Sequence, residues 1–123
     1  MPSNRIAKCF SDTLAAIELI ETWIADAGGA DQAVLADLKA RSAIERQLLI
    51  VSEAAIRLHK LDPSLAPRLA PDIDWPGIRG IGNFIRHRYD DLDLTAVTDV
   101  IGNRLGPLRT ACEGALSTLA KGG

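Results

Sequence analysis

The sequence has little cysteine, no long apolar run and almost no excess charge. Its two cysteines, Cys9 and Cys112, have no CxxC partner and no histidine at ligand spacing, which argues against a zinc site and favours reduced thiols in a core. The apolar runs are only a few residues long, far too short to cross a bilayer, and Asp12 interrupts any stretch resembling a signal peptide. We therefore expect a cytoplasmic protein that does not contact membranes.

The near balance of charge limits the possible partners. A net charge of -2 excludes a surface that is basic all over and coats nucleic acid, so any affinity for an anion must be local. A chain of 123 residues is long enough for one hydrophobic core and too short for two. We expect a single helical domain over residues 1–123.

Apolar residues recur at helical spacing, and no stretch alternates with the period of a strand. A first helix carries apolar residues every three or four positions from Ile6 to Ile24 and should end at Gly28 and Gly29. Asp31 can cap a second helix that continues to Leu58, with a bend near residue 42.

The second half of the chain predicts two more helices after a long connection. Prolines at positions 63, 67, 71 and 76 leave room for at most one short helical turn before Trp75 and Pro76 open a third helix. Thr95 can cap a last helix, which Pro107 should kink. These patterns predict an all-α fold, an antiparallel up-and-down bundle of four to five helices.

The segment GIRGIGNFIRHRYDDLD, residues 77–93, concentrates basic residues and then acidic ones. On a helix, Arg79, Asn83 and Arg86 share one flank, and His87 follows Asn83 by four residues. A guanidinium one turn from an imidazole suits a phosphate group. Such a pair can take a proton from a ribose 2′-hydroxyl and stabilise the resulting charge without a metal. The alternative is a charged helix flank that is simply solvated.

Part of this segment, GIGNFIRHRYDDLD, resembles the signature of the HepT-like family of bacterial toxins in the HEPN superfamily, whose motif reads Arg, a few residues, His, any residue, Tyr. Two further blocks occur in the family's order. ARSAIERQLLIVSEAAIRL, residues 40–58, is similar to the family's second helix, and LGPLRTACEGAL, residues 105–116, is similar to its final helix.

The resemblance implies a metal-independent endoribonuclease that acts on RNA as a homodimer, with the two motif helices facing each other across a groove. It implies no cofactor. It also implies a partner, an MNT-type nucleotidyltransferase antitoxin that adds AMP to the motif tyrosine. By position, His87 would be the general acid or base, Tyr89 the modified residue and Asn83 the polar residue that follows the motif arginine. Arg88 would join the cluster that binds phosphate.

The chain departs from the family pattern at Gly82, where most members carry the motif arginine. Arg79 lies one turn before this position and Arg86 one turn after it, so either could bring a guanidinium to the same place. Two hypotheses stay open. One is an RNA-cleaving toxin, and the other is a catalytically inactive helical dimer that binds nucleotide or a partner protein.

Three other groups of residues allow a functional and a structural interpretation. Glu53 could face the groove or be an ion-paired surface residue. Trp23 and Trp75 lie outside the basic segment and are better explained as packing residues than as platforms for bases. The acidic residues at 90, 91 and 93 are better explained by a helix end near Asp90 than by a metal site, and a fraying end would leave Tyr89 accessible.

Overall fold

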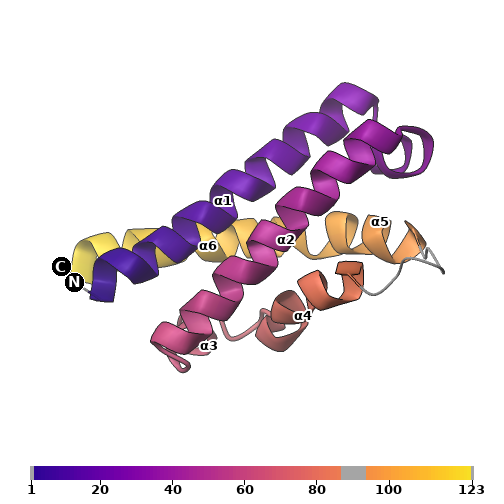
Figure 1. Cartoon of the computed structure of the whole chain (residues 1–123). Coiled ribbons are helices and arrows are strands. Elements are labelled where there is room, and N and C mark those ends of the chain that lie inside the picture. The colour runs from indigo at the N-terminus through magenta and orange to yellow at the C-terminus, as the bar shows by residue number, and fades with distance from the viewer. Residues whose placement is uncertain (1, 87–93, 123) are drawn as a thin grey trace.

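All regular structure in the described part of the chain is helical. The computed structural model describes residues 2–86 and 94–122 (Figure 1). The elements are α1 (Pro2–Ala27), a π-helical turn η1 (Gln32–Ala36), α2 (Leu38–Leu61), α3 (Leu65–Leu69), α4 (Trp75–Arg86), α5 (Leu94–Asn103) and α6 (Leu105–Gly122). The prediction of an all-α bundle is confirmed.

The helices pack as antiparallel neighbours around one hydrophobic cluster. Helix α2 runs back along α1, α4 packs on α2, and α6 lies along α1 so that the two chain ends come together (Figure 1). None of the helices described is long and apolar enough to cross a membrane. The largest fully buried side chains come from α1, η1, α2, α5 and α6, and they include Phe10, Ile17, Ile20, Val34, Ile44, Leu48, Val51, Val97, Leu105, Leu108 and Cys112.

The ends of the first two long helices have local causes. Helix α1 stops as predicted, because Gly28 and Gly29 take φ values of 93° and 139°, which side chains strongly disfavour. The prediction that Asp31 caps the second helix is wrong, since Asp31 is itself helical and makes no capping bond. Asp37 is the cap: its backbone is extended and its carboxylate accepts a hydrogen bond from the backbone N–H of Ala40 at 3.1 Å. The interruption therefore lies at residue 37 and not near residue 42.

The second half follows the predicted order with two differences. The proline-rich connection holds only the five-residue helix α3, and α4 opens at Trp75, as predicted. The predicted last helix is divided at Arg104 into α5 and α6, because Pro107 has no N–H to donate to the carbonyl one turn earlier. Thr95 is the second residue of α5 and so is not its cap.

The remaining packing predictions are confirmed. Trp75 is buried, and its indole N–H donates to the carbonyl oxygen of Ala70 at 3.0 Å. Trp23 is partly buried against the core, and the thiols of Cys9 and Cys112 are free and buried.

Candidate functional site on helices α2 and α4

Helix α4 carries the described part of the predicted site. Arg79 is half-buried, whereas Asn83 and Arg86 are exposed. Asn83 makes no side-chain hydrogen bond to any residue in the described ranges. The other predicted site residues, together with the acidic cluster, lie outside the described residues; they are His87, Arg88, Tyr89, Asp90, Asp91 and Asp93.

Helices α2 and α4 are joined by hydrogen bonds at Ser52 and Gly82. The Ser52 hydroxyl donates to the backbone carbonyl of Arg79 at 2.7 Å and accepts from the backbone N–H of Gly82 at 3.0 Å. Ser52 is 1% exposed, so water cannot replace either bond without opening the interface. These two bonds fix the position of α4 on α2 at Gly82.

The absence of a side chain at Gly82 is what permits this approach. A Cβ atom at residue 82 would lie 3.0 Å from Ser52 Oγ and 3.3 Å from Ser52 Cβ, which is tighter than ordinary van der Waals contact. The third nearest atom is Nη1 of Arg86, at 3.4 Å. Arg86 therefore lies over the glycine, while no side-chain atom of Arg79 comes as near.

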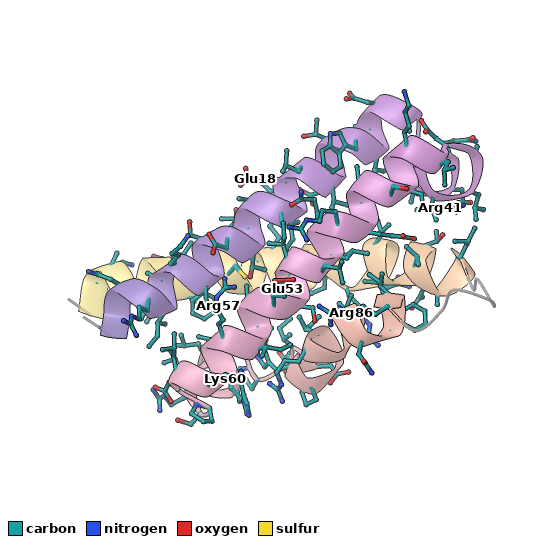
Figure 2. All side chains as sticks on the ribbon, viewed as in Figure 1. Glu18, Arg41, Glu53, Arg57, Lys60 and Arg86 are labelled. Carbon is teal, nitrogen blue, oxygen red and sulfur yellow. The ribbon has the colours of Figure 1, made fainter. Side chains whose placement is uncertain are left out.

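Glu53 orients the Arg86 side chain from the neighbouring helix. Its Oε1 lies 3.9 Å from Arg86 Nη2, and the two side chains are 46% and 52% exposed. A half-exposed pair at this distance adds little to stability, but it gives the guanidinium a preferred direction. In Figure 2 Glu53 and Arg86 lie side by side where α2 passes α4, so Glu53 faces α4 and takes part in an ion pair.

The opposite side of α4 borders a shallow groove. It has a volume of about 300 Å³ and lies between α4 and α5, where Phe84 is 40% exposed. Its lining includes Gly80, Val100 and Arg104, and Arg104 approaches Asp74 at 3.5 Å. An exposed aromatic ring beside a groove is a feature that a second protein surface can cover.

The arrangement favours recognition of an anion by arginine. Arg86 is accessible, its guanidinium offers paired donors, and Glu53 offsets only part of its charge. Within residues 2–86 and 94–122, no three His, Cys, Asp or Glu side chains come together as metal ligands would.

Ser52 was not among the site residues predicted from the sequence. The residue stands between Leu48 and Ala55, at helical spacing among buried positions, so a polar side chain there needed a hydrogen-bond partner. That signal was present in the sequence, although it did not identify the partner.

Comparison with protein families agrees with the motif. The model of the family described as Ribonuclease HepT-like matches residues 13–114, which is most of the chain. No curated protein and no solved structure matches the chain. Because the match extends from α1 into α6, the chain belongs to the HepT-like ribonuclease family.

Proposed function

We propose that this protein is the RNA-cleaving toxin of a toxin–antitoxin pair and that Arg86 replaces the missing motif arginine. The observation that carries the proposal is the 3.4 Å approach of Arg86 Nη1 to the point where a Cβ at Gly82 would stand. A guanidinium thus occupies the space beside the first motif position, although it originates one turn later. Family membership supplies the reaction class.

The proposed reaction needs a base, an acid and a cation. His87 removes the proton of a ribose 2′-hydroxyl, and that oxygen attacks the adjacent phosphorus. The bond to the 5′ oxygen breaks, leaving a 2′,3′-cyclic phosphate and an alcohol that takes up a proton. In a homodimer, the His87 of the second protomer can supply that proton. Arg86 stabilises the negative charge that grows on the phosphate oxygens, with Asn83 as a neighbouring donor.

Silencing is proposed to act through Tyr89. An MNT-type nucleotidyltransferase would transfer AMP from ATP to the phenol oxygen and release pyrophosphate. The attached phosphate would stand next to His87, Arg88 and Arg86, where it would compete with RNA for the same donors. Intact-mass measurement after incubation with the transferase and ATP tests this step. AMP increments on wild type and none on Tyr89→Phe are expected, and increments that persist on the variant would refute it.

The nuclease proposal is tested by RNA cleavage in the presence of a metal chelator. Wild type should cleave, His87→Ala should not, and Arg86→Ala should be strongly impaired. Light scattering on the same samples should give the mass of a dimer. Cleavage by His87→Ala at the wild-type rate would refute the assigned base.

A second candidate is a catalytically inactive helical dimer that binds nucleotide or a partner protein. Gly82 favours it, because the residue that most family members use at this position is absent. Cleavage by neither wild type nor His87→Ala, with dimerisation intact, would select this candidate.

A further inference from the structure

A basic cleft lies between α1 and α2, outside the motif segment. Its volume is about 330 Å³. Four cationic side chains and two apolar residues line it, namely Arg5, Lys8, Arg57 and Lys60 with Cys9 and Leu61. We call this surface the α1–α2 cleft.

The α1–α2 cleft keeps an excess of positive charge. Asp12 is its counter-ion, since its two carboxylate oxygens lie 3.1 Å from Lys8 Nζ and 3.1 Å from Arg57 Nη2. Arg5 and Lys60 are exposed and form no ion pair with any residue in the described ranges. Four cations and one carboxylate leave a net charge of +3 in a chain whose total is -2. Such a local excess attracts a polyanion.

The cleft continues the surface that carries Arg86. Residues 53, 57 and 60 of α2 are spaced by four and three positions, so they lie along one face. Figure 2 shows Lys60, Arg57 and Glu53 in sequence along α2, with Arg86 beside Glu53. Seven residues of helix span about 10 Å, a distance that takes two or three phosphates of one nucleic-acid strand.

We propose that the α1–α2 cleft binds the sugar–phosphate backbone of single-stranded RNA beyond the scissile phosphate. This inference rests on the proposed function. The cations hold successive phosphates, while the exposed Leu61 offers apolar surface to a base. An acidic peptide also matches the charge, but we favour RNA because Arg86 lies beside Glu53 on the same side of α2 as Arg57 and Lys60.

Binding is measured by fluorescence anisotropy with a labelled 2′-O-methyl RNA 12-mer, which cannot be cleaved. Arg5→Gln/Lys60→Gln should bind about 10- to 100-fold more weakly at low salt, and its slope of log affinity against log salt should fall by about 1.4, or roughly 0.7 per lost phosphate contact. Lys39→Gln is the matched control because it lies on the same helix, about 27 Å from Arg57. Equal affinities of the wild type and the double variant for the RNA would overturn the proposal. So would RNA binding that added salt does not weaken in either protein.

Kinetics separate this inference from the proposed nuclease activity. Against a dinucleotide, which ends before the cleft, the double variant should cleave like wild type; against a 12-mer its KM should rise about 10-fold or more at unchanged kcat. If the protein is a nuclease and the double substitution leaves its KM for the 12-mer unchanged, the proposed function stands and the proposed RNA binding by the α1–α2 cleft is refuted. Tighter binding of a poly-aspartate peptide than of RNA would also overturn it. RNA binding that depends on Arg5 and Lys60 in a protein that cleaves nothing would support the cleft and refute the nuclease.

Discussion

Substituting Gly82 by alanine should destabilise the protein, although alanine is the better helix former. The added Cβ would meet Ser52 Oγ at 3.0 Å and Ser52 Cβ at 3.3 Å. Ser52 cannot yield easily, because its hydroxyl is held by two hydrogen bonds and its Cβ is part of α2. The clash must therefore be relieved by moving one helix from the other.

The expected free-energy change combines two opposing effects. Inserting a methyl group into a well-packed contact costs about 1–3 kcal/mol. Replacing glycine by alanine inside a helix stabilises the folded state by about 0.5–1 kcal/mol. Gly82→Ala should thus lower the free energy of unfolding by about 1 kcal/mol.

A double-mutant cycle in urea, followed by circular dichroism, isolates the contact. In a Ser52→Gly background the obstruction is gone, so Gly82→Ala should raise the free energy of unfolding by about 0.5–1 kcal/mol. Gly114→Ala is the control, since Gly114 is exposed in α6 and a Cβ there meets no atom within 4 Å. If Gly82→Ala is as stabilising as Gly114→Ala in the wild-type background, the proposed contact does not exist.

Three further predictions concern other parts of the chain. Arg86→Ala should slow RNA cleavage by roughly 30- to 1000-fold while Arg79→Ala has a much smaller effect, because only Arg86 lies over Gly82; equal losses would remove the basis for assigning Arg86. Asp37→Ala should cost about 1 kcal/mol of stability in urea and Asp31→Ala close to nothing, since only Asp37 accepts a capping bond; equal costs would contradict the helix boundary. Burial raises the pKa of the Cys112 thiol from 9.0 to about 12, so the folded state disfavours the thiolate. The free energy of unfolding should then fall as pH rises above the unfolded value of 9.0, and Cys112→Ala should lack this part of the fall; superimposable pH profiles would contradict it.

Most of the fold could be predicted because its causes are local. Two adjacent glycines end α1, and Trp75 with Pro76 opens α4; each signal acts on the residues beside it. The start of α2 could not be assigned in this way, because Asp31 and Asp37 are equally good caps by residue type. The choice depends on the turn between them, where Ala33 and Val34 are fully buried. That burial is a tertiary effect, which residue spacing alone does not contain.

The sequence predicted which face of α4 carries the candidate site, but not which residues of α2 that face contacts. Helical spacing placed Arg79 and Arg86 on the side of Gly82, and Arg86 does lie there. It could not distinguish the two arginines, because both stand one turn from the glycine. The difference comes from α2, where the Glu53 carboxylate orients the guanidinium of Arg86.

Gly82 and Ser52 are best understood as one feature of this chain. Any arginine at residue 82 must carry a Cβ, and Ser52 would have to yield by a few tenths of an ångström to admit that atom. The close helix contact therefore disfavours an arginine at residue 82. Arg86 avoids this constraint because it leaves α4 one turn later, beyond the contact, and reaches back over the glycine. The position of Arg86 over Gly82 thus follows from the helix packing, and the proposed replacement of the motif arginine rests on that position.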